Sequence, residues 1–327
     1  MDLKIGLPIL LVFGVSIISF ATTTKEISFK NRDVTLQGTL YYPKGEGPFP
    51  AVVFVHGSGP ETRDNSKYSA KWMASIGYVA LTYDKRGTGE SDGDENDWKR
   101  FSFEHLAGDI MAAVDILATD PKVKAAKIGI HAASQGGWVS VLAAAKSEKI
   151  NFMIIKSASV TTVHEDRVFE RTQRLKKEEF SDDELAQAKT IQNVEAKTSE
   201  EDLFPDLFEK YKDTPWIKRV YGDLEPSHPS LIAYREWYST IAYFDPITYL
   251  KQIDIPIMWI FGDPKLDNHG PVKKSIENLE SLIASKNYEI RSYSDQDHNV
   301  KEKEYEADLY QWLIKINGDN GFKFRKH

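Results

Sequence analysis

A serine in a tight turn is the first residue of this sequence whose surroundings favour chemistry. Ser134 lies in the stretch Ala-Ala-Ser-Gln-Gly, which departs from Gly-x-Ser-x-Gly only at Ala132. That pattern describes a strand-to-helix turn that presents a serine hydroxyl at the end of a strand. The run from Lys127 to His131 predicts the strand, and Gln135 to Ala145 predicts the helix. Ser134 is therefore a candidate nucleophile; the alternative is a small residue in an unrelated turn.

A serine hydroxyl is a weak nucleophile unless a base takes its proton, and histidine is the side chain best suited to this near neutral pH. His298 ends the loop Ser-Asp-Gln-Asp-His, directly after the last predicted strand, Tyr288 to Tyr293. An acid must then orient the imidazole, and Asp263 and Asp267 follow the strand before it. These residues would form a Ser-Asp-His relay in that chain order.

Two further loops follow predicted strands. His56-Gly-Ser-Gly59 comes directly after the run Ala51 to Val55, and its glycines allow the backbone to bend close to a substrate. We interpret His56 as a structural loop histidine. The segment Asp84 to Ser91, with two glycines, reads as a turn whose Asp and Arg tie neighbouring loops together.

Strands and helices alternate along most of the chain, which predicts an α/β fold with a mostly parallel, doubly wound sheet. From about residue 158 to 244 the pattern is of helices and turns only, which predicts a helical insertion inside one domain of residues 22–327. The predicted strands are Lys25 to Lys30, Val34 to Tyr42, Ala51 to Val55, Tyr78 to Tyr83, Lys127 to His131, Phe152 to Lys156, Ile257 to Phe261 and Tyr288 to Tyr293. The predicted helices outside the insertion are Tyr68 to Ser75, Phe103 to Thr119, Gln135 to Ala145, Val272 to Ser285 and Glu302 to Ile316.

With these loops in order on one scaffold, the sequence resembles the α/β-hydrolase fold, and His56 to Asp64 resembles a branch of capped esterase- and peptidase-like members. The resemblance covers Lys25 to Ile316. It implies a catalytic triad of Ser134, an acid and His298. It also implies an oxyanion hole, the pair of N–H groups that binds the negatively charged oxygen of the transition state, from the backbone of Ser58 and Gln135. Some lipases of this fold carry Ala where Ala132 stands.

The acid is assigned by the same resemblance. Relatives commonly read Gly-Glu-x-Asp with a proline four residues beyond that Asp, whereas Lys265 stands three residues after Gly262 here. Counting back from Pro271 selects Asp267 and implies an insertion; Asp263 is the alternative. Asp263, Asp267 and His269 could in principle hold a metal, but no metal or other cofactor is expected.

The amino-acid composition limits the classes of binding partner that the protein can have. The 327 residues include 41% hydrophobic and 28% charged residues, with a net charge of −7, no basic tract and no cysteine. Nucleic acid and anionic membrane surfaces are therefore poor candidate partners, and disulfides and thiol chemistry are excluded.

Ile5 to Phe20 is almost wholly apolar and Ser19-Phe-Ala21 suits cleavage after Ala21, so we expect a signal peptide over residues 1–21 and a periplasmic or secreted protein. An uncleaved N-terminal anchor is the alternative.

The sequence thus predicts an exported serine hydrolase that cleaves carboxylic esters of small to medium substrates through an acyl-enzyme. An exopeptidase or amidase acting on short peptides is the first alternative, and a non-catalytic binding protein of the same fold is the second. A few aromatic residues of the insertion should line the pocket. The candidates are Phe204, Phe208, Tyr211, Trp216, Tyr221, Tyr234, Trp237, Tyr238, Tyr243 and Phe244.

Overall fold

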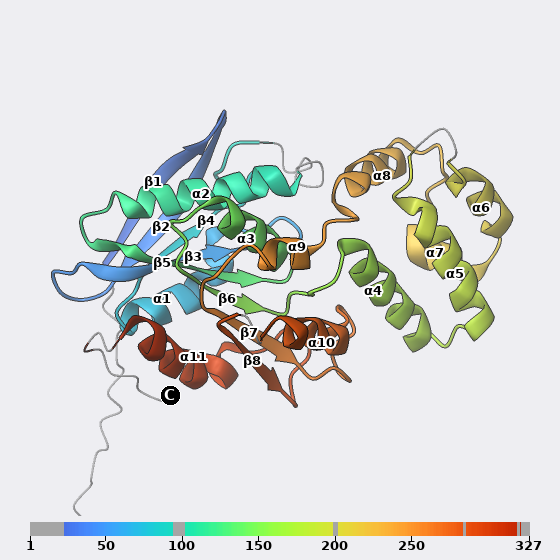
Figure 1. Cartoon of the computed structure of the whole chain (residues 1–327). Helices are drawn as coiled ribbons and strands as arrows, with labels where there is room; N and C mark the ends of the chain where they lie inside the picture. Colours follow the sequence, from blue (N-terminus) through green and yellow to red (C-terminus); the bar gives the residue numbers. More distant parts are fainter. Residues whose placement is uncertain (1–22, 94–101, 199–201, 284–285, 319–320, 322–327) are drawn as a thin grey trace, which may run out of the picture.

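Eight strands form one sheet in the order β1-β2-β4-β3-β5-β6-β7-β8 (Figure 1). The computed structural model describes residues 23–93, 102–198, 202–283, 286–318 and 321. The strands are β1 (Thr23–Asn31), β2 (Val34–Tyr42), β3 (Phe49–Val55), β4 (Val79–Tyr83), β5 (Val123–Ala133), β6 (Phe152–Lys156), β7 (Ile257–Gly262) and β8 (Tyr288–Tyr293). The segment expected to be a signal peptide lies outside the described residues.

The sheet is parallel from β4 to β8, and β1 and β2 extend it in antiparallel fashion. All seven residues of β3 are buried, as expected for a strand covered on both faces. The prediction of a mostly parallel α/β sheet with helices on both faces is therefore confirmed. Several strands are longer than predicted, β5 most of all, because it pairs with β3 as far back as Val123 and Phe49, beyond an irregularity in the register.

Successive residues of the central strands face opposite layers of helices. Val53 and Val55 belong to one apolar cluster, while Val52 and Phe54 belong to the other. Helices α2, α3 and α9 cover one face in Figure 1, and α1 and α11 cover the other. The bounds are α1 (Lys67–Ser75), α2 (Phe103–Ala118), α3 (Gln135–Lys146), α9 (Pro246–Leu250), α10 (Val272–Ile283) and α11 (Glu302–Asn317). Of these helices, only the short α9 was not predicted from the sequence.

The chain between β6 and β7 leaves the sheet to form a group of helices at one end, here called the cap (Figure 1). Its helices are α4 (Val163–Lys177), α5 (Asp182–Glu195), α6 (Phe204–Tyr211), α7 (Pro215–Tyr221) and α8 (Pro229–Ile241). Ser181 and Glu184 form a capping box at the start of α5.

The cap has an apolar core of its own. Five of its predicted aromatics are buried there with aliphatic residues of α4, α5, α7 and α8: Phe204, Phe208, Tyr211, Trp216 and Tyr221. A buried ion pair between Arg171 and Glu195 joins α4 to α5. Among the residues that the structure describes, no helix is both long and apolar enough to span a membrane.

Candidate active site

Ser134 lies at the junction of β5 and α3, where the strand ends and the helix begins. Its backbone dihedrals are φ 49° and ψ −122°, a conformation that residues with a side chain rarely adopt. The turn is so tight that a Cβ added to Gly136 would lie 2.5 Å from the backbone oxygen of His56. Ala132, by contrast, is fully buried in the strand and is accommodated. The local sequence therefore produces the strained strand-to-helix turn that holds a nucleophile in other enzymes.

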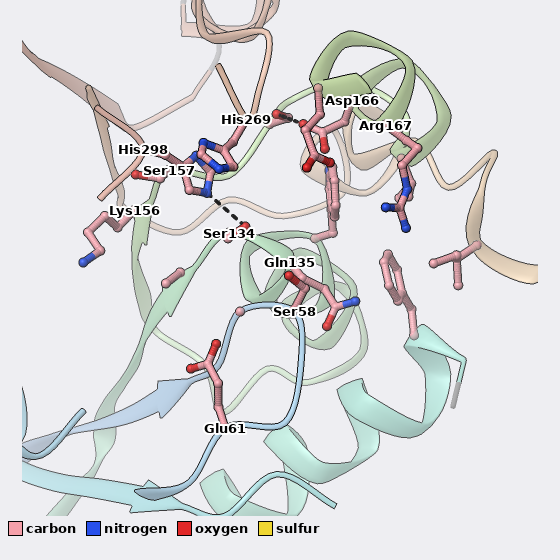
Figure 2. Close-up of a pocket in the computed structure, with 18 of the residues that line it drawn as sticks. Ser58, Glu61, Ser134, Gln135, Lys156, Ser157, Asp166, Arg167, His269 and His298 are labelled. Carbon is pink, nitrogen blue, oxygen red and sulfur yellow. Dashed lines mark hydrogen bonds between the residues drawn. The ribbon is translucent and has the colours of Figure 1, made fainter. Parts of the chain in front are cut away.

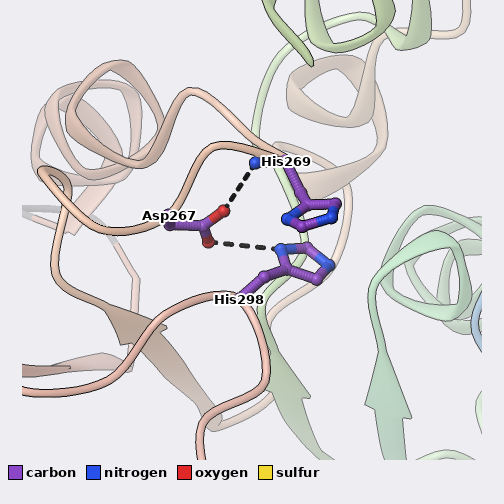
Figure 3. A group of neighbouring side chains, drawn as sticks. All are labelled: Asp267, His269 and His298. Atoms are coloured by element: carbon purple, nitrogen blue, oxygen red, sulfur yellow. Dashed lines mark hydrogen bonds and ion pairs between the residues drawn. The ribbon is translucent and has the colours of Figure 1, made fainter. Parts of the chain in front are cut away.

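His298 connects Ser134 to Asp267 (Figures 2 and 3). Its Nε2 lies 3.2 Å from Ser134 Oγ, and its Nδ1 lies 3.2 Å from Asp267 Oδ2. With the imidazole proton on Nδ1, that nitrogen donates to Asp267 and Nε2 is free to accept the serine proton. The loops after β5, β7 and β8 thus bring the three predicted residues together at the carboxyl ends of their strands.

The two candidate acids have different surroundings. The carboxylate of Asp267 is buried, and its Oδ1 accepts hydrogen bonds from the backbone N–H groups of His269 and Gly270, 2.9 and 3.3 Å away. These bonds hold Oδ2 toward His298. Asp263 instead accepts a bond from the backbone N–H of Lys265 at 2.8 Å, within its own turn. The geometry places Asp267, rather than Asp263, beside the histidine.

The charges around His298 favour its protonated form. Burial opposes that charge, but the hydrogen bond and the negative charge of Asp267 outweigh it, with further contributions from Asp166 and Asp297. The pKa of His298 is consequently raised above its ordinary value. A histidine with a raised pKa is, in its neutral form, a stronger base for the serine proton.

The two predicted oxyanion donors lie beside Ser134 (Figure 2). Ser58 and Gln135 both line the pocket that holds the serine, Ser58 from the loop after β3 and Gln135 from the first residue of α3. His56, at the start of the same loop, is buried, with Nε2 on the backbone oxygen of Tyr83 and Nδ1 3.4 Å from Glu61. This histidine supports the loop and does not reach the serine.

The turn from Asp84 to Ser91 ties loops together. The carboxylate of Asp84 accepts bonds from the backbone N–H groups of Arg63 and Glu90, at 2.8 and 2.9 Å. Arg86 forms two bonds of 2.6 Å with Asp109 on α2, and both side chains are buried. Such a buried, bidentate pair fixes the turn against the helix.

A pocket of about 560 Å³ opens above Ser134 between the sheet and the cap. The part of the chain outside the cap contributes Ser134 and His298 and the aromatic side chains of Phe103 and Trp138. The cap contributes Val163, Asp166, Arg167, Glu170, Tyr234, Trp237 and Ile241. Of the ten aromatic candidates in the insertion, Tyr234 and Trp237 line this pocket.

The sequence did not predict the three charged pocket residues of the cap. Asp166, Arg167 and Glu170 lie on one face of α4, and the capping box of Thr162 and Glu165 marks only where this helix begins. Burial raises the pKa of Asp166 to about 7, although a hydrogen bond from Ser159 opposes the shift. The Arg167 guanidinium lies 5.6 Å from the ring centre of Tyr234.

One group of side chains in the described part of the chain has the residue types of a metal site. The candidate ligand atoms of Asp267, His269 and His298 lie within 4.8 Å of one another (Figure 3). Both oxygens of Asp267 already bind hydrogen-bond donors, and the His269 ring packs 4.9 Å from that of His298. The group therefore has the organisation of a hydrogen-bonded relay.

Comparisons with known proteins identify the family of the chain. Residues 33–263 match the family described as X-Pro dipeptidyl-peptidase (S15 family). The chain is 26% identical over 303 residues to esterase EstD of Thermotoga maritima, a match that covers 89% of this chain and 65% of that esterase. The chain thus spans less than two thirds of the length of this relative.

Solved structures support the fold. An esterase of Pyrococcus furiosus superposes with a TM-score of 0.60 at 16% identity, covering 91% of this chain and 92% of that one. The alpha/beta hydrolase GrgF of Penicillium gives 0.60 at 20% identity, covering 92% and 100%. With the fold shared by these structures and a family match over most of its length, the chain belongs to the X-Pro dipeptidyl-peptidase (S15) family of α/β hydrolases.

Proposed function

We propose that the protein is a serine hydrolase that cleaves carboxylic esters of small to medium size through an acyl-enzyme. The observation that carries this proposal is the continuous relay from Asp267 through His298 to Ser134, at 3.2 Å for each step, on the floor of a pocket. Similarity to an esterase over 89% of the chain supports the ester as substrate.

In this mechanism Ser134 Oγ attacks the ester carbonyl carbon while His298 Nε2 takes the hydroxyl proton. The negative charge that develops on the carbonyl oxygen is stabilised by the backbone N–H groups of Ser58 and Gln135. The imidazolium then gives its proton to the alcohol oxygen as the C–O bond breaks, which leaves an acyl group on Ser134. Water attacks that acyl group with His298 again as the base, and the acid and free enzyme are released.

Each residue has a distinct part in this cycle. Asp267 keeps the proton on Nδ1 of His298 and stabilises the imidazolium that forms twice in each turnover. The raised pKa of His298 follows from this same contact. The cap closes the pocket above the serine and would select the acyl and alcohol parts of the substrate.

Hydrolysis of short peptides from their amino terminus is the second candidate. The matched family is described as a dipeptidyl-peptidase, and Asp166 and Glu170 place two carboxyl groups on the cap side of the pocket. Carboxylates in that position suit an ammonium group. The same triad would then cleave an amide, with His298 donating its proton to the leaving amine.

A panel of substrates tests the proposal. Purified protein should hydrolyse p-nitrophenyl esters of short acyl chains faster than aminoacyl-p-nitroanilides, and Ser134→Ala should lower kcat by about 10³-fold or more. A fluorophosphonate probe should label the wild-type protein and not the variant. Faster cleavage of the anilides would favour the peptidase, whereas no turnover and no labelling would favour a non-catalytic binding protein.

A further inference from the structure

Lys85 is a buried lysine whose ammonium lies directly beneath the loop after β3. It comes two residues after β4, and its Nζ lies 2.7 Å from the backbone oxygen of Gly57 and 3.2 Å from that of Gly59. The same nitrogen lies 2.9 Å from Oε1 of Gln135. One cation therefore binds both segments that are proposed to supply the oxyanion donors.

The bond to Gly57 fixes the direction of the next N–H group. The carbonyl of Gly57 and the N–H of Ser58 belong to one peptide unit, and in a planar trans peptide these two bonds point in opposite directions. Within the described residues the cis peptide is Gly47-Pro48, so the peptide of Gly57 and Ser58 is trans. A carbonyl held toward Lys85 therefore turns the Ser58 N–H away from Lys85.

An N–H group of Ser58 that points away from Lys85 points toward the pocket. Gly57 and Ser58 line the space above Ser134, whereas Lys85 lines a small buried cavity behind the loop together with His56 and Tyr83. The lysine and the nucleophile thus lie on opposite sides of the same peptide. A Cβ on Gly57 would lie 3.6 Å from the Cβ of Ser134, which shows how closely the loop approaches the serine.

The loop needs such an anchor because its own backbone is permissive. Glycine flanks Ser58 on both sides, and Gly59 has a φ of +93°. Glycine adopts either sign of φ at little cost, so a peptide next to it rotates readily. A rotated peptide would present the Gly57 carbonyl, rather than the Ser58 N–H, to the negatively charged oxygen of the transition state.

We propose that Lys85 is the positioning residue of the oxyanion hole, holding the Ser58 N–H in its productive direction and fixing Gln135 at the start of α3. This inference rests on the proposed hydrolase function. The ammonium also polarises the peptide, because a cation on the carbonyl oxygen makes the N–H of the same unit a stronger donor. Lys85 acts only through the loop and α3, and it does not touch the substrate.

The charge on Lys85 is compatible with this role. Burial lowers the pKa of Lys85 to about 8, while the charges of Glu61 and Asp109 oppose the shift. The group therefore remains largely protonated at neutral pH. An ammonium has three hydrogens to donate, and the two carbonyls and the Gln135 side chain are three acceptors.

The test separates catalysis from folding. Lys85→Met keeps an unbranched side chain one atom shorter than lysine but removes its charge and its donors. We expect kcat for p-nitrophenyl butyrate to fall on the order of 10²-fold, as when one oxyanion donor is lost, with KM changed only a few-fold. Lys127→Met is the matched control, because Lys127 also donates to a backbone carbonyl, that of Asn317, far from Ser134. It should leave kcat unchanged.

A chemical rescue gives a second, independent measurement. The chain contains no cysteine, so Lys85→Cys introduces a unique thiol. Alkylation in urea with 2-bromoethylamine, followed by refolding, restores an ammonium at the reach of lysine, while 1-bromopropane gives a neutral group of the same length. Only the aminoethyl form should recover the kcat of the wild type.

The outcomes are decisive. If the wild type hydrolyses no ester or anilide, the proposed function fails, independently of Lys85. If the wild type is active and a folded Lys85→Met or S-propyl protein retains its kcat, the positioning role is wrong. If neither neutral form folds, Lys85 stabilises the domain as a whole and this assignment is also wrong.

Discussion

At the scale of single residues, the site depends on one strained turn and on the charges around one histidine. A residue held at the dihedrals of Ser134 costs on the order of 1–3 kcal/mol, and it persists because β5 and α3 fix both sides of the turn. The strain keeps Oγ directed at His298 instead of into the helix. The proposed nucleophile is thus positioned at a local cost in stability.

The pocket carboxyl group of Asp166 should influence the pH at which the enzyme works. His298 must be neutral to accept the serine proton, so activity is lost as the pH falls through its pKa. Asp166 is one of the charges that raise that pKa. The pKa of Asp166 is itself about 7, so the group is only partly charged across this limb. Replacing it with Asn removes that partial charge, so the acid limb of kcat/KM against pH should move modestly to lower pH. A pH–rate profile of Asp166→Asn measures this shift.

Glu170 provides the control for that experiment. It also lines the pocket from α4, but its negative charge raises the pKa of Asp166. Glu170→Gln should lower that pKa and keep Asp166 charged to lower pH, so the acid limb should not move to lower pH, even where the change alters KM. An acid limb that Asp166→Asn leaves unchanged, or moves upward, would show that Asp166 does not act on the histidine.

Some residues of the site can be recognised in the sequence, and others cannot. Ser134 and His298 are marked by short motifs after predicted strands, because local spacing determines those loops. Asp166 lies in no such motif, and Lys85 lies in the turn from Asp84 to Ser91 without any sign of its own role. The groups that they act on are far away in the chain: Asp166 influences a histidine 132 positions later, and Lys85 binds carbonyls before it and an amide after it. Their roles appear only when the sheet brings these segments together.

At the scale of elements, the approach of α3 to β3 determines where the nucleophile stands. Gly136 faces the backbone oxygens of Val55 and His56, which a Cβ would approach to 3.0 and 2.5 Å. Alanine favours a helix over glycine by about 1 kcal/mol, but a contact this short with rigid backbone outweighs that gain. Gly136→Ala should therefore destabilise the protein by about 1–3 kcal/mol.

Urea unfolding measures this change, with Ala132→Gly for comparison. Ala132 occupies the corresponding position on the strand side, where the methyl group is already accommodated, so its removal should cost about 1 kcal/mol or less. A Gly136→Ala protein as stable as the wild type would show that the helix can move away from the strand without penalty.

Element types were more predictable than element ends. Continuous apolar runs such as Ala51 to Val55 can only be buried strands in an alternating α/β chain, and they are. The first residues of β5 alternate less clearly, because Lys124, Ala125 and Ala126 are exposed, and Val123 pairs with Phe49 of β3 only across an irregularity in the register. Helix α9 is too short for its periodicity to be visible.

At the scale of the whole molecule, the proposed function assigns the chemistry and the selection of substrate to different parts of the chain. The serine, the histidine and the acid lie on loops of the sheet, while the opposite wall of the pocket comes from α4 and α8 of the cap (Figure 1). The cap has its own apolar core, but the residues at its two ends are not part of that core. Val160, Val163, Trp237, Tyr238 and Ile241 pack in the core of the sheet.

This division predicts the result of a cap exchange. Residues 164–236 should be replaced with the equivalent segment of a related hydrolase, so that Val163 and Trp237 remain and the sheet keeps its packing. The ranking of kcat/KM among esters of different acyl size should change, because the residues that contact the distant part of the substrate are new. Inactivation by diisopropyl fluorophosphate, which is small enough to require only the triad and the oxyanion donors, should proceed within a few-fold of the wild-type rate. An unchanged substrate ranking in a well-folded chimera would assign selection to the sheet side of the pocket, where Phe103 and Trp138 lie.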